Sequence, residues 1–271
     1  MMLSFATDSA PPMSWIQLGG FFCIEFGTGT LGALAFVPPA PVGAPFYRIV
    51  ASLAAIPLAL GLWLLSLVGG ATTVITILVL GALVALPFFC MPTKGRMRWA
   101  ALATAIGATG AAVIVNLLSS LEAGLGLRGI AVLSALGSGL LVGVIGVAMT
   151  LGHAYLTYPN LKLSHLERLN RVSAAVLLLK TLFVIITVYV FAKDFEPLRA
   201  AIGTSMGQFW LLTRFAAGLA IPFVFYWMVK SSLLYKNTRS ATGILYASTA
   251  LVLIGEALAM SLRGQAGGVP L

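Results

Sequence analysis

Apolar stretches long enough to cross a bilayer constrain this chain more than any other feature. Residues 174–192 read AAVLLLKTLFVIITVYVFA, close to the roughly 20 residues that an α-helix needs to span the hydrocarbon core. They lack the two-residue alternation of membrane barrel strands. Because lipid cannot satisfy backbone amides, a spanning segment must be a helix or part of a closed barrel. We therefore predict an all-α, polytopic transmembrane helix bundle that forms a single domain over residues 1–271.

Scarcity of charge supports a lipid-facing surface. Only 8% of the residues are charged and 60% are hydrophobic, whereas a soluble domain has about 25% charged residues. The formal net charge is +9, but the basic residues gather near predicted helix ends rather than along one stripe. This distribution is typical of membrane orientation and not of nucleic-acid binding. The predicted partner is the lipid bilayer, with no nucleic acid.

Hydrophobic runs and turn residues divide the chain into eight predicted helices. The second and third are separated only by VGGATT at 68–73, where paired glycines interrupt the pattern. One long, bent segment there would instead leave seven spans. The predicted helices cover roughly residues 14–37, 47–69, 71–91, 97–118, 129–153, 170–193, 208–231 and 241–262.

Lysine and arginine are distributed unequally between the two sets of helix ends. One set carries Arg48, Lys94, Arg96, Arg98, Lys162, Arg168, Arg171, Lys230, Lys236 and Arg239. The other set carries Arg128, Lys193, Arg199 and Arg263. Since basic loops remain in the cytoplasm, we predict that the N-terminus and the C-terminus both lie outside it. On the cytoplasmic side the sequence predicts a single acid, Glu167. A bacterial-type cytoplasmic (inner) membrane fits this pattern.

Ionisable residues inside predicted helices are the sharpest functional signal. Glu25, Lys180, Arg214 and Glu256 would each cost at least about 2.5 kcal/mol at the bilayer centre unless paired or hydrated. At about 1.5 Å per residue, Arg214 and Glu256 both lie roughly 9 Å below the outer surface. Glu25 and Lys180 fall nearer the middle and are predicted to form a second buried charge pair. Asn116 adds an amide near the outer end of its helix.

Two interpretations of these residues remain open. They could be structural ion pairs that hold the helices in register, or they could form a polar pocket or proton path open to the outer half of the membrane. Gly139 and Gly143, and the segment EFGTGTLGAL at 25–34, are predicted to let neighbouring helix backbones approach closely.

The sequence offers few residues that could bind haem or a metal. His153 lies at the inner end of its predicted helix and His165 in the following loop, so haem b is not expected, although His153 stays a candidate haem ligand or proton shuttle. Cys23 and Cys90 stand alone, which argues against an iron–sulfur cluster or zinc in this chain. Walker, HExxH and GxSxG motifs are absent from the sequence. We expect no catalysis by the chain alone.

The last two predicted helices carry a family resemblance. Arg214 in the seventh, followed by LIGEALAMSL at 253–262 in the eighth, resembles the membrane-anchor subunits of dimethyl-sulfoxide reductase and polysulfide reductase. The resemblance implies an eight-helix, often haem-free protein that exchanges quinol with an extracytoplasmic redox subunit. Its matching positions are Arg214, Gly255 and Glu256. Those families often place an arginine about three residues after the Gly-Glu, where this chain has Ala-Leu-Ala-Met.

Three functional hypotheses follow. In the first, the chain is a subunit of an electron-transfer complex with a quinone pocket in the outer half of the membrane. There Glu256 exchanges a proton, Arg214 holds the carboxylate or the quinone oxygen, and Asn116 donates a hydrogen bond. The second hypothesis is a small secondary transporter or channel that uses the buried charges for a solute or proton. The third is a structural or assembly subunit of a membrane complex.

Overall fold

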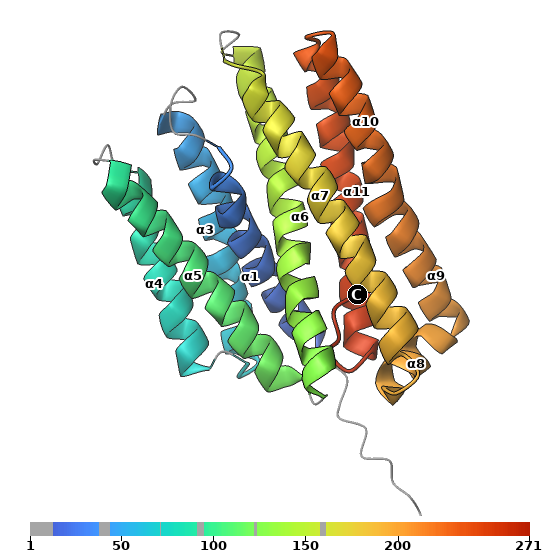
Figure 1. The fold of residues 1–271 in the computed structure, drawn as a ribbon. Helices are drawn as coiled ribbons and strands as arrows, with labels where there is room; N and C mark the ends of the chain where they lie inside the picture. The colour runs from blue at the N-terminus through green and yellow to red at the C-terminus, as the bar shows by residue number, and fades with distance from the viewer. Residues whose placement is uncertain (1–12, 38–43, 71, 91–94, 122–123, 158–160) are drawn as a thin grey trace, which may run out of the picture.

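The computed structural model describes residues 13–37, 44–70, 72–90, 95–121, 124–157 and 161–271. In these residues eight long helical segments run side by side, and one short helix lies at an end of the bundle (Figure 1). Six of the segments are long and apolar enough to cross a membrane. The chain is therefore a polytopic helical membrane protein, as predicted.

The helix bounds follow the predicted segments closely. The five helices of the first half are α1 (Trp15–Leu34), α3 (Ala44–Leu67), α4 (Thr73–Cys90), α5 (Gly95–Ser120) and α6 (Leu125–Thr157). The second half contains α7 (Ser164–Ile186), α8 (Glu196–Gly203), α9 (Ser205–Phe215), α10 (Ile221–Leu234) and α11 (Thr238–Gln265). Two π-helical turns extend these: η1 (Thr187–Phe191) continues α7, and η2 (Ala216–Ala220) joins α9 to α10.

The paired glycines do separate α3 from α4. Gly69 adopts a φ of 67°, a left-handed conformation that glycine tolerates without steric cost, and α4 resumes at Thr73. The alternative of one bent segment is therefore wrong.

Neither α1 nor α4 is among the six segments that meet the criteria of length and hydropathy for a membrane span. The short amphipathic helix α8 was not predicted.

Glycines let α1 pack directly against α6. A Cβ atom on Gly139 of α6 would lie 2.1 Å from the backbone oxygen of Glu25. A Cβ on Gly143 would lie 2.3 Å from the backbone of Gly29. The predicted close backbone approach is confirmed. In Figure 1 this contact joins a group formed by α1, α3, α4 and α5 to a group formed by α6, α7, α9, α10 and α11.

The chain begins and ends its helical part at the same end of the bundle. Helix α1 starts, and α11 finishes, at the lower end in Figure 1. The residues after α11 then turn back at Gly267 and Gly268, whose φ angles are 61° and 89°. Val269 and Leu271 are fully buried in the core. This terminal segment, residues 266–271, covers the lower part of the bundle interior.

Candidate functional site: a buried layer of charged side chains

Arg214 and Glu256 meet in the interior of the second helix group. Nη2 of Arg214 on α9 donates to Oε1 of Glu256 on α11 at 2.6 Å, and both side chains are fully buried. Each lies nine residues from the lower end of its helix, a depth of about 14 Å. The two residues that the sequence placed at one depth on neighbouring helices thus form an ion pair.

Two glycines make room for the guanidinium. A Cβ atom on Gly255 would lie 2.4 Å from Cα of Gly218 and 3.0 Å from Nη1 of Arg214. A Cβ on Gly218 would lie 2.4 Å from the same nitrogen. Because η2 and α11 touch at these glycines, no larger residue fits without displacing Arg214. Gly255, one of the positions singled out by sequence, therefore has a steric role beside the ion pair.

The predicted direct pairing of Glu25 with Lys180 is wrong. Oε1 of Glu25 instead accepts from Nη1 of Arg263 at 2.6 Å, and the two side chains are 3% and 1% exposed. Arg263 had been assigned to the outer surface because the apolar run stops just before it. The helix continues to Gln265, however, and the terminal segment covers the side chain, with Nε donating to the oxygen of Gly268 at 3.2 Å.

Lys180 is held by a hydroxyl rather than by a carboxylate. Its Nζ donates to Oγ of Ser134 on α6 at 2.6 Å and to the backbone oxygen of Ser134 at 3.1 Å. Ser134 Oγ in turn donates to the oxygen of Pro270 in the terminal segment at 3.1 Å. Among the described residues no acid lies within ion-pair distance of this fully buried lysine.

These five ionisable side chains form one electrostatic unit, which we call the charged layer. It consists of Glu25, Lys180, Arg214, Glu256 and Arg263. Both acids and both arginines act on the charge of Lys180 through space. If all five residues are ionised, the layer has one more positive than negative charge. Such a layer is expensive in an apolar bundle, so its members must be compensated by one another and by hydrogen bonds.

Several polar atoms of the charged layer keep free hydrogen-bonding capacity. Within the described part of the chain, Nε and Nη1 of Arg214 and Oε2 of Glu256 have no hydrogen-bond partner, although they are buried. The buried hydroxyl of Thr187, at the start of η1, also has no hydrogen-bond partner among the described residues. Buried polar atoms are normally satisfied by protein or water. The ion pair can therefore accept further polar groups from a ligand or from water.

An apolar groove lies on the outside of α7 and α9, near this ion pair. Its volume is about 430 Å³. Val184 and Leu211, which line the groove, also pack in the apolar cluster that contains Val252. Val252 lies one helical turn before Glu256 on α11, so this cluster connects the groove to the ion pair. Both walls change from α-helix to π-helix at the groove, a distortion that is frequent at functional sites. The lining residues are Val184, Ile185, Val188, Tyr189, Gln208, Leu211, Leu212 and Phe215.

Other residues predicted for the site lie elsewhere. Asn116 is buried, but it lies on α5, which packs against α1, α4 and α6 and not beside Arg214 and Glu256. His153 is exposed on α6. Among the described residues no group of three or more His, Cys, Asp or Glu could hold a metal ion. Sequence reasoning missed Arg263 and Ser134 because neither stands out in its own segment.

Comparisons with protein-family models, with curated proteins and with solved structures find no match for this chain. The function must therefore be argued from the chemistry of the site.

Proposed function

We propose that this chain is the membrane subunit of an electron-transfer complex, and that the α7–α9 groove binds a quinol beside Arg214 and Glu256. The observation that carries the proposal is a buried ion pair with free hydrogen-bonding atoms next to an apolar groove. A quinol needs an apolar slot for its ring and tail, together with a few polar groups at its oxygens.

The chemistry assigns a different task to each residue. Oxidation of a quinol to a quinone releases two protons and two electrons. Glu256 Oε2, which has no partner, can accept a proton from a quinol hydroxyl. Arg214 Nη1 can donate to the oxygen as it becomes a carbonyl. The electrons pass to a partner redox protein, so the chain works as a subunit rather than as a solitary enzyme.

The orientation of the bundle supports a site in the outer half. We propose that all eight long segments span the membrane, with the basic ends of the helices in the cytoplasm. Among the described residues, the basic side chains near the opposite ends are Arg128, Lys193, Arg199 and the buried Arg263. Arg214 and Glu256 are about 14 Å from those ends. Both termini would then face away from the cytoplasm, and quinol protons would leave on the outer side.

A groove-filling substitution tests the proposal without touching the ion pair. Leu212 lines the groove and is 68% exposed to lipid, so Leu212→Trp should fill the groove and leave the core intact. Leu178 on α7 is 58% exposed and lies outside the groove, which makes Leu178→Trp the matched control. We expect nanodiscs with the control to retain a radiolabelled short-tailed quinone as the unsubstituted protein does, and Leu212→Trp to lose it. Equal retention by both variants would overturn the site.

Purification from native membranes tests the wider assignment. The full chain, tagged and extracted in mild detergent, should co-elute with a redox protein, and mass spectrometry should detect a bound quinone. Glu256→Gln should lower quinol oxidation by that complex while the complex still assembles. A chain that elutes without a redox protein and moves protons or solutes in liposomes would replace the proposal with transport. Full quinol oxidation by Glu256→Gln would leave the ion pair a structural role.

A further inference from the structure

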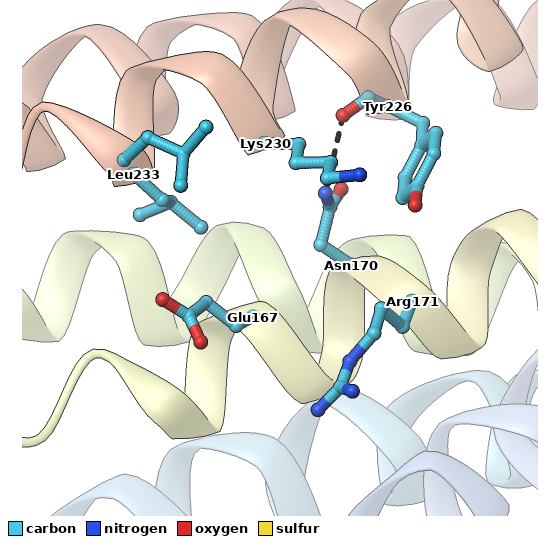
Figure 2. Close-up of a pocket in the computed structure, with 7 residues that line it drawn as sticks. Glu167, Asn170, Arg171, Tyr226, Lys230 and Leu233 are labelled. Atoms are coloured by element: carbon cyan, nitrogen blue, oxygen red, sulfur yellow. Dashed lines mark hydrogen bonds between the residues drawn. The ribbon is translucent and has the colours of Figure 1, made fainter.

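A second pocket lies at the basic end of the bundle, between α7 and α10 (Figure 2). It has a volume of about 240 Å³ and is lined by Glu167, Asn170, Arg171, Tyr226, Lys230, Leu233 and Leu234. Buried Asn170 forms its floor, because Nδ2 donates to the backbone oxygen of Tyr226 at 3.1 Å and ties the two helices together. The charged layer has no member in this pocket.

Charges of both signs line the pocket. In Figure 2, Lys230 ends beside Asn170, whereas Glu167 lies toward Leu233. Arg171 follows Glu167 by four residues, a spacing that favours an ion pair on a helix, yet these two form no ion pair among the described residues. Lys230 contacts the ring of Trp227 at 4.9 Å. The Glu167 carboxylate is therefore available to a ligand, whereas the Arg171 guanidinium extends away from α10 in Figure 2.

Glu167 is unusual for its position. Among the described residues at the basic end of the bundle it is the single acid, and it lines a pocket together with Arg171 and Lys230. An anion alone would gain from Lys230 but would be repelled by Glu167. A zwitterionic ligand with a phosphate and an ammonium group complements both Lys230 and Glu167.

We propose that this pocket binds the headgroup of an ethanolamine phospholipid. The lipid phosphate accepts from Lys230, and the ammonium group donates to Glu167. A choline headgroup has no N–H to donate to the carboxylate, and a glycerol headgroup has no cation for it. The pocket therefore selects ethanolamine over both.

The wall of the pocket identifies a lipid as the source of this headgroup. Leu234 lines the pocket and is 73% exposed, and Tyr235 beside it is 83% exposed. Exposed aromatic residues at helix ends mark the membrane interface. The acyl chains of the lipid can continue from the pocket along the exposed side of α10, while the small cavity encloses only the headgroup.

Native mass spectrometry of the delipidated full chain tests the proposal. Ethanolamine, glycerol and choline phospholipids with identical acyl chains are added in turn, and we expect the ethanolamine lipid to be retained best. Glu167→Gln and Lys230→Gln should each weaken its binding about tenfold, as expected for loss of a charge-assisted hydrogen bond. Arg168→Gln and Lys236→Gln change exposed charges outside the pocket and should leave binding unchanged.

Two results would overturn the proposal. The first is equal retention of the three lipids, or equal losses in the pocket variants and their controls, because the charges would then act only as a general basic surface. The second is displacement of the lipid by soluble phosphoethanolamine at the same concentration, which would make the ligand a free metabolite. Monodisperse elution of Glu167→Gln establishes that the variant is folded.

Discussion

Removing the carboxylate of Glu256 should destabilise the protein far more than removing an exposed one. Glu256 and Arg214 are both fully buried and 2.6 Å apart, so Glu256→Gln leaves a guanidinium in an apolar interior without its counter-charge. Breaking a buried pair in this way costs about 3–5 kcal/mol. The chain offers a matched control in Glu196, whose partner is Arg199 and whose pair is 68% and 61% exposed. Glu196→Gln should change the free energy of unfolding by about 0–1 kcal/mol.

A double-variant cycle isolates the contribution of the pair. Arg214→Gln together with Glu256→Gln removes both charges, so the double variant should be more stable than the sum of the two single losses predicts. The free energy of unfolding is measured by titrating detergent-solubilised protein with sodium dodecyl sulfate and following near-ultraviolet circular dichroism. Additive losses, or a loss for Glu256→Gln no larger than that for Glu196→Gln, would refute the inference that these two charges depend on each other.

Two further predictions concern packing and Lys180. Gly139→Ala places a Cβ against the backbone of α1 and should destabilise the fold by about 1–3 kcal/mol. Gly146→Ala on the same helix meets no atom within 4 Å and should leave the free energy of unfolding unchanged. The same detergent titration measures both variants. Ser134→Ala should lower the free energy of unfolding by about 1–3 kcal/mol because it removes an acceptor from buried Lys180. Adding Lys180→Met should recover most of that stability. A double variant no more stable than Ser134→Ala would contradict this prediction.

Local composition determined where the long helical segments of this protein lie, and six of them are long and apolar enough to cross a membrane. The hydrophobic runs located the eight long segments, and the glycines after α3 ended that helix where the sequence predicted. Arg214 and Glu256 could be placed at one depth because helix rise is constant and their helices neighbour each other in sequence. Gly139 likewise marked a close helix contact, since a missing side chain has the same steric effect in any partner arrangement.

Only the tertiary structure decided which buried charges meet. Glu25 pairs with Arg263, 238 positions away. Arg263 is buried because α11 continues past it to Gln265 and the terminal segment covers its side chain, and no local pattern encodes that long-range contact. Lys180 is left with Ser134 as its hydrogen-bond partner, and the Ser134 hydroxyl in turn donates to the oxygen of Pro270 in the terminal segment. Asn116 lies four residues from the end of α5, in the other helix group. Depth follows from position along one helix, whereas proximity depends on how all the helices pack.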